Sequence, residues 1–207
     1  MTLDTWIAFF VACWLISLSP GAGAVYAMSC GVEHGFRRGY VGTIGLIAGL
    51  WTVLAVAALG LGGLLAASEL AFQAVKWAGV AYLVWLGVRQ WRSAAAGIEA
   101  DRSARGGSAW GRIGRGWAVN ATNPKGLLFM LAVVPQFVDA TRPLVPQYLI
   151  IGATFAFTDV VVMAAYTAMG ARVLALLRRP RQVRLLNRGF GALFVGAAAL
   201  LAGFHRS

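Results

Sequence analysis

The chain has 207 residues, of which 59% are hydrophobic and only 12% charged, whereas soluble domains carry roughly 25% charged residues. A chain this apolar cannot cover its surface with polar groups, so we expect it to lie in a lipid bilayer. Six crossings of about 20 residues each would use about 120 residues, which leaves no room for a soluble catalytic or nucleic-acid-binding domain.

Apolar runs long enough to cross a bilayer recur along the chain and predict an all-α integral membrane protein with six transmembrane helices. The runs lack the polar alternation of transmembrane β-barrel strands, so helices are the spanning structure that fits. The six expected spans are residues 5–28, 40–67, 70–88, 117–138, 146–171 and 187–204.

The net charge of +11 would indicate a nucleic-acid partner in a soluble protein, but here the basic residues lie between apolar runs. Three of them, Lys76, Arg142 and Arg206, fall on one side of the expected membrane, and Lys125 falls inside a span. The other fourteen follow the first, third and fifth spans: Arg37, Arg38, Arg89, Arg92, Arg102, Arg105, Arg112, Arg115, Arg172, Arg178, Arg179, Arg181, Arg184 and Arg188.

Basic residues collect in the cytoplasmic loops of membrane proteins, so this asymmetry predicts that both termini lie outside. The basic loops are expected to contact anionic lipid headgroups, and no nucleic-acid partner is expected. Because each half has three spans, an odd number, the second half crosses the membrane in the opposite direction to the first. We therefore expect two inverted three-helix repeats, residues 1–92 and 117–207, joined by a basic cytoplasmic linker at 93–116. Inverted repeats are common in secondary transporters.

Two helix-breaking motifs interrupt the first and fourth spans. Each contains a proline followed by a glycine, and the two prolines lie about 12 Å and about 10 Å from the cytoplasmic ends of their spans. Broken helices expose backbone N–H and C=O groups that can bind the carboxylate and the ammonium of a zwitterion. Two ordinary proline kinks are the alternative. The expected substrate-pathway residues are Ser19, Pro20, Gly21, Asn120, Asn123, Pro124 and Lys125.

An acidic residue, Asp159, lies near the middle of the fifth span, thirteen residues before Arg172. A charge at this depth costs a few kcal/mol, so Asp159 is expected to face a cavity or a partner. It is the candidate for proton coupling, or a counter-charge to a substrate ammonium. The alternatives are a structural ion pair with Lys125 and a protonated acid bonded to a neighbouring backbone. Lys125 itself lies nearer the interface, where it could extend toward the headgroups.

Signatures of enzymes and of metal or cofactor sites are missing from the sequence. The two histidines, His34 and His205, lie at or beyond span ends on opposite sides of the membrane, so neither can pair with a serine inside it. The chain has no HExxH zinc motif and no Walker loop. Cys13 and Cys30 lack the spacing of a zinc site and are expected to be small core residues. We therefore expect no enzyme activity and no cofactor, with the proton motive force driving transport.

Several motifs resemble those of the LysE/RhtB amino-acid exporter family, and they occur in the right order over nearly the whole chain. They are Ser19-Pro20-Gly21, the glycine-rich region 31–49 with Arg37-Arg38-Gly39, the stretch 76–87, Asn123-Pro124-Lys125 and Pro135-Gln136-Phe137. The resemblance implies a bacterial inner-membrane protein that exports amino acids or their derivatives in exchange for protons.

The chain departs from the family pattern directly after the first motif. The family typically continues Ser-Pro-Gly with Pro-Asn, whereas this sequence has Ala22 and Gly23. A polar substrate contact at position 23 is therefore not implied, and the change either alters the substrate or weakens activity.

Together these features predict an inner-membrane secondary transporter that exports an amino acid or related small zwitterion by proton antiport, with its oligomeric state open. One alternative is a metal-cation exporter, against which the spans offer few carboxylates and no histidine or cysteine cluster. Another is a membrane protein that transports nothing, such as an assembly factor.

Overall fold

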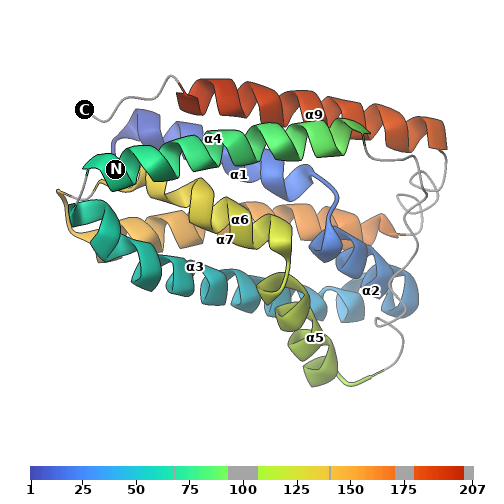
Figure 1. The fold of residues 1–207 in the computed structure, drawn as a ribbon. Coiled ribbons are helices and arrows are strands. Elements are labelled where there is room, and N and C mark those ends of the chain that lie inside the picture. Colours follow the sequence, from blue (N-terminus) through green and yellow to red (C-terminus); the bar gives the residue numbers. More distant parts are fainter. Residues whose placement is uncertain (68, 93–106, 140, 171–179, 203–207) are drawn as a thin grey trace.

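The protein is a bundle of helices that lie side by side (Figure 1). A computed structural model describes residues 1–67, 69–92, 107–139, 141–170 and 180–202. The elements are α1 (Leu3–Leu18), α2 (Ala22–Gly39), α3 (Val41–Ala67), α4 (Glu69–Arg92), α5 (Ala109–Ala121), α6 (Pro124–Ala132), the 3₁₀ helix η2 (Val134–Phe137), α7 (Leu144–Ala168) and α9 (Pro180–Ala202).

The described part of each apolar run is mostly helical, but several boundaries differ from the prediction, among them the start of α9 at Pro180, before the expected span at 187–204. α2 continues to Gly39, where a loop was expected after residue 28, and its helical geometry is interrupted at Gly35, which has a φ of 70°. α5 begins at Ala109, inside the predicted linker, because the Ser108 hydroxyl caps it by accepting from the Gly111 N–H at 3.1 Å. Both helices therefore extend into segments that their polar composition marked as loops.

The longer α5 changes the environment of one predicted loop arginine. Arg112 is buried within this helix, and its Nη1 donates to the Gly107 carbonyl at 2.9 Å. The arginines at the ends of α2 and α4, such as Arg37 and Arg92, are exposed. The linker residues 93–106, together with Arg102, Arg105, Arg172, Arg178, Arg179 and Arg206, lie outside the described residues.

The number of membrane crossings stays a prediction. By length and apolar composition, two helical stretches in the described parts of the chain can cross a membrane alone, Val41–Leu59 and Leu144–Ala168. A third crossing is added if α1 and α2 form one bent span. α4 and α9 carry arginines at one end, and α6 has only nine residues. Length and apolar composition therefore do not identify these three helices as membrane crossings.

The first described helix starts, and the last described helix finishes, at the same end of the bundle. The N-terminal end of α1 and the C-terminal end of α9 lie together there, and the arginine-bearing ends of α2 and α4 lie at the opposite end (Figure 1).

Two separate groups of buried apolar side chains form the core. The first cluster joins α1, α3, α4, α6, η2, α7 and α9 and contains Phe9, Cys13 and Phe129. The second cluster joins α2, α3, α7 and α9 and contains Tyr26 and Cys30. Both cysteines are buried and form no disulfide within the described residues, which confirms them as core residues. The first break separates the two clusters along the chain, since Ile16 of the first cluster precedes it and Ala24 of the second follows it.

Candidate functional site

The first helix break separates α1 from α2. Ser19 caps α1 in an extended conformation, with φ −70° and ψ 119°, as expected for a residue that precedes proline. Pro20 cannot donate a backbone hydrogen bond, and α2 restarts after Gly21 at an angle of 55° to α1. The break leaves backbone carbonyls of α1 and backbone N–H groups of α2 without partners inside their own helices.

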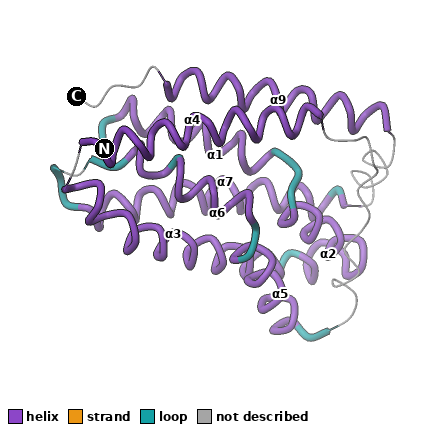
Figure 2. The backbone as a smooth tube through the Cα atoms, viewed as in Figure 1, coloured by secondary structure: helices purple, strands orange, loops and turns teal. Residues whose placement is uncertain are grey.

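The second break separates α5 from α6, and Figure 2 shows both breaks as short non-helical connections. Asn123 caps α6, its side-chain oxygen accepting from the Lys125 N–H at 3.1 Å. Pro124 occupies the first turn of α6, where a missing N–H does not weaken the helix. Each break therefore has a local cause in its own motif, and each turns a helix N-terminus toward the same region.

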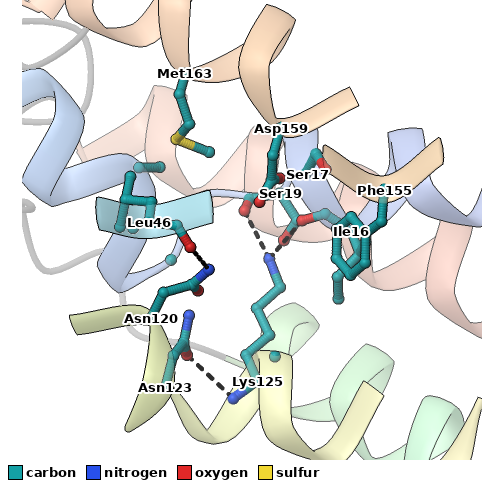
Figure 3. A pocket seen from close by; sticks show the side chains of 14 residues that line it. Ile16, Ser17, Ser19, Leu46, Asn120, Asn123, Lys125, Phe155, Asp159 and Met163 are labelled. Atoms are coloured by element: carbon teal, nitrogen blue, oxygen red, sulfur yellow. Dashed lines mark hydrogen bonds between the residues drawn. The ribbon is translucent and has the colours of Figure 1, made fainter. Parts of the chain in front are cut away.

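A small cavity of about 50 Å³, lined by both polar and apolar groups, lies between the two breaks. Figure 3 shows its lining side chains, which come from both broken spans, from α3 and from α7. Pro20 and Pro124 are not among the lining residues; they shape the breaks beside it. The other six predicted site residues line the cavity together: Ser19, Gly21, Asn120, Asn123, Lys125 and Asp159.

The Lys125 side chain points into the bundle and binds the C-terminal end of α1. Its Nζ donates to the carbonyl oxygens of Ile16, at 2.9 Å, and Ser19, at 2.6 Å (Figure 3). The Nζ also lies 5.9 Å from the centre of the Phe194 ring. The ammonium therefore takes carbonyl groups that the break leaves open and does not extend toward the headgroups.

The Asp159 carboxylate binds the same end of α1. Asp159 is 8% exposed, and one of its oxygens accepts from the Ser17 hydroxyl at 2.7 Å. Within the described chain, the hydrogen bonds of Lys125 and Asp159 run to α1 and none joins the two. The geometry thus differs from the direct ion pair considered as an alternative.

The Ser19 hydroxyl is a buried polar group that lines the cavity and has no hydrogen-bond partner within the described residues. The side chain is only 3% exposed, and a buried polar group left unpaired is unfavourable by about 1–3 kcal/mol. By contrast, the Asn120 amide donates to the Leu46 carbonyl at 2.7 Å and is held against α3. Ser19 is therefore the lining side chain that most plainly offers a hydrogen bond to a ligand.

The cavity also has walls that the sequence did not predict. Ser17, Gly23 and Gly126 lie inside the break motifs at 17–23 and 120–126 but were not named as site residues, and Ala24 directly follows the first motif. Phe155 and Met163 lie four residues before and after Asp159, which is the spacing of one helix face. Ile16 and Leu46 carry no comparable signal. The residues added by the structure are Ile16, Ser17, Gly23, Ala24, Leu46, Gly126, Phe155 and Met163.

Comparison with known proteins decides the family. The sequence model of the LysE type translocators matches residues 14–203. The chain belongs to this family. It is similar to a homoserine/homoserine lactone efflux protein of Salmonella typhimurium, with 42% identity over 202 residues that cover 98% of each chain. It is also similar to a leucine efflux protein of Enterobacter sp., with 29% identity over 98% of this chain and 97% of the relative.

A third relative, from Vibrio cholerae, is named as an uncharacterized membrane protein and is 38% identical over 98% of each chain. No solved structure matches the chain. Family membership and the apolar helices identify a multi-pass protein of the bacterial inner membrane. The family is one of translocators, in agreement with the absence of enzyme motifs from the sequence.

Proposed function

We propose that this LysE type translocator exports a small amino acid or a related zwitterion through the cavity between its two broken helices. The observation that carries the proposal is the opposite polarity of the groups at that cavity. Residues of the α2 and α6 N-termini line it, and helix N-termini attract a carboxylate. Carbonyl oxygens at the C-terminal end of α1 bind an ammonium, at present that of Lys125.

The names of the relatives support an amino-acid substrate, since they concern the efflux of homoserine, its lactone and leucine. The cavity walls suit a small side chain of that kind, with Phe155 and Met163 providing apolar surface and Ser19 an unpaired hydroxyl. These same names do not favour the metal-cation alternative.

The cavity is too small to hold an amino acid in this structure, so transport requires it to widen. Its volume of about 50 Å³ accommodates one or two water molecules at about 30 Å³ each and is far below the roughly 300 Å³ of small-molecule sites. Residues of both apolar clusters line it, such as Phe155 from the first and Met163 from the second. Separating one cluster while the other stays packed would open the cavity to one side of the membrane at a time.

The proposed topology has six crossings in two inverted repeats, residues 1–92 and 117–207, joined by the linker 93–116, with both termini outside. The positions of the first and last described helix ends at one end of the bundle, and of exposed arginines at the other, support this orientation. In this arrangement the exposed arginines contact anionic headgroups on the cytoplasmic side.

For energy coupling, we propose proton antiport with Asp159 as the proton carrier. Protonation from the outside favours release of the substrate there, and deprotonation on the inside permits reloading. The burial of Asp159 in the wall of the cavity supports this role, because a change of its charge is felt directly by a bound zwitterion. No cofactor takes part, and the proton gradient supplies the energy.

The experiment that tests the proposal is transport by purified protein in liposomes with an imposed pH gradient. Labelled homoserine, threonine, leucine and lysine form the panel, and liposomes without protein or without the gradient are the controls. We expect gradient-driven movement of at least one small amino acid. Movement of none of them, with protein correctly inserted, would reject the function, and movement of divalent metal ions instead would favour the cation-exporter alternative.

A further inference from the structure

The ammonium of Lys125 is already bound where a substrate ammonium would be expected to bind. Its two acceptors, the carbonyls of Ile16 and Ser19, lie at the C-terminal end of a half-helix, where the backbone carries partial negative charge. Both residues line the cavity. In a broken transmembrane helix such carbonyls are natural ligands for a cation, and here the cation belongs to the protein itself.

The carbonyls at this break need a partner whenever the substrate is absent. Buried acceptors without a hydrogen bond are unfavourable, and bonds to charged groups are among the stronger ones. The neighbouring Leu18 carbonyl is satisfied separately, since the Tyr166 hydroxyl donates to it at 2.6 Å. Lys125 therefore satisfies the two carbonyls of the break that face the cavity.

We propose that Lys125 is a tethered occupant of the ammonium subsite. Its ammonium binds the Ile16 and Ser19 carbonyls in the substrate-free protein and leaves them when the ammonium of an amino acid binds there. This inference rests on the proposed function and adds a role for one residue. The displaced Lys125 needs a new partner because an unpaired buried charge is costly, and the substrate carboxylate supplies one within the cavity.

The packing of the Lys125 side chain is compatible with such a movement. A Cβ added at Gly21 would lie 3.4 Å from Cδ and 3.7 Å from Nζ of Lys125, so the glycine leaves the stem of the lysine free of side-chain contact on that side. The flexible four-carbon stem can then reposition its charge without movement of α6.

The proposal predicts that loss of Lys125 slows the return of the substrate-free transporter more than any other step. Net efflux requires the transporter to return without substrate, and in that state only Lys125 holds the two carbonyls. Exchange of internal for external substrate does not need the empty carrier to reorient, because a new substrate binds on the side where the old one is released. Loss of the lysine charge should therefore slow net efflux far more than exchange.

The test compares the wild-type protein with Lys125→Met and Lys125→Arg in liposomes loaded with labelled homoserine. Net efflux is measured into buffer without substrate, and exchange into buffer with unlabelled homoserine. In Lys125→Met we expect the ratio of exchange to net efflux to rise about tenfold or more, from the loss of charged hydrogen bonds. Lys125→Arg keeps a cationic donor and should stay closer to the wild-type ratio. Lys76→Met removes the only other lysine and serves as the matched control.

An equal fall of exchange and net efflux in Lys125→Met would overturn the inference, because it would make Lys125 an ordinary substrate ligand or a structural residue. A wild-type protein that moves no amino acid would instead reject the proposed function. Should Lys125→Met fail to insert, Lys125→Gln replaces it, since its amide still donates to a carbonyl. A raised ratio in that variant supports the inference, and the wild-type ratio contradicts it.

Discussion

Lys125 and Asp159 bind the same end of α1 without forming an ion pair with each other. The lysine donates to the Ile16 and Ser19 carbonyls, and the carboxylate accepts from the Ser17 hydroxyl between them. The two charges belong to α6 and α7, so the broken end of α1 connects both helices through hydrogen bonds. A change in charge at either residue thus alters the hold of its helix on the break, which is a physical basis for coupling proton movement to substrate binding.

The first prediction concerns the charge of Asp159. Asp159→Asn keeps the size of the side chain and an oxygen that can accept from Ser17, but it cannot exchange a proton. We expect transport driven by a pH gradient to be lost, while the protein still inserts and elutes normally. Liposome assays with and without the gradient measure the effect, and undiminished gradient-driven transport would remove Asp159 from the mechanism.

Asp139→Asn is the matched control for that variant. The Thr141 hydroxyl and N–H both donate to Asp139, which holds the pKa of this loop carboxyl below its usual 3.8, and Arg142 adds to the effect. Because the pKa of Asp139 is lowered in the folded protein, the ionised carboxylate stabilises the fold at pH values above the unfolded-state pKa. This stabilisation is lost as the pH falls through the folded-state pKa. Asp139 therefore stays ionised across the pH range of transport, and its replacement should leave the response to a gradient as in the wild type.

The second prediction separates two neighbouring serines by stability and by binding. Ser17→Ala deprives buried Asp159 of its 2.7 Å donor, so we expect a loss of about 1.5–3 kcal/mol in unfolding free energy. Ser19→Ala removes a buried hydroxyl that has no partner in the described structure, so its unfolding temperature should be unchanged or higher. If the Ser19 hydroxyl contacts the substrate, the KM for transport should nevertheless be higher in Ser19→Ala than in the wild type.

Thermal unfolding followed by tryptophan fluorescence, together with transport KM, distinguishes the two serines. An unfolding temperature that falls equally in both variants would show that Ser19 has a structural partner. An unchanged KM in Ser19→Ala would exclude its hydroxyl as a substrate contact.

The third prediction concerns the close contact of α2 with α7. A Cβ added at Gly31 would overlap the Thr167 carbonyl oxygen, so Gly31→Ala must push the helices apart. Overpacking of this kind costs about 1–3 kcal/mol, and we expect a lower unfolding temperature and slower transport. Gly114→Ala is the control, because an added Cβ there meets nothing within 4 Å. Equal stability of the two variants would show that α2 and α7 separate freely at this point.

The sequence was most informative where backbone chemistry is local. Proline removes a backbone donor and glycine loosens a helix, so an interruption at both motifs was predictable, and the breaks bring Ser19, Asn123 and Lys125 to one cavity. An intramembrane carboxylate must be buried against something polar, which made Asp159 a candidate. These predictions needed no knowledge of which helices are neighbours.

The features that were missed depend on packing between distant segments. Leu46 lines the cavity and accepts from Asn120 only because α3 packs against α5. Arg112 was assigned to a loop by its charge, but the helix cap at Ser108 and the close packing of α5 bury it. The acceptors of Lys125 are backbone carbonyls that the first break was expected to expose, but their pairing with Lys125 depends on where the fold places α6.

The last prediction concerns Gly23, where the resemblance to the family leads us to expect an asparagine. A Cβ added at Gly23 would lie 3.6 Å from Cδ2 of Leu46, which is an ordinary contact, so a side chain fits there. Gly23→Asn places an amide in a cavity of about 50 Å³. Sites that hydrogen-bond a hydroxyl discriminate strongly against analogues that lack one. We therefore expect the ratio of homoserine transport to leucine transport to be higher in Gly23→Asn than in the wild type.

Competition between labelled homoserine and unlabelled leucine measures this preference in liposomes. Gly23→Ala is the control, since it adds the same Cβ without the amide. A preference that changes equally in both variants would show that bulk alone acts at this position. A preference that changes only in Gly23→Asn would mean that the residue at position 23 sets the choice of substrate, and an increase in all rates would mean that the glycine weakens the transporter.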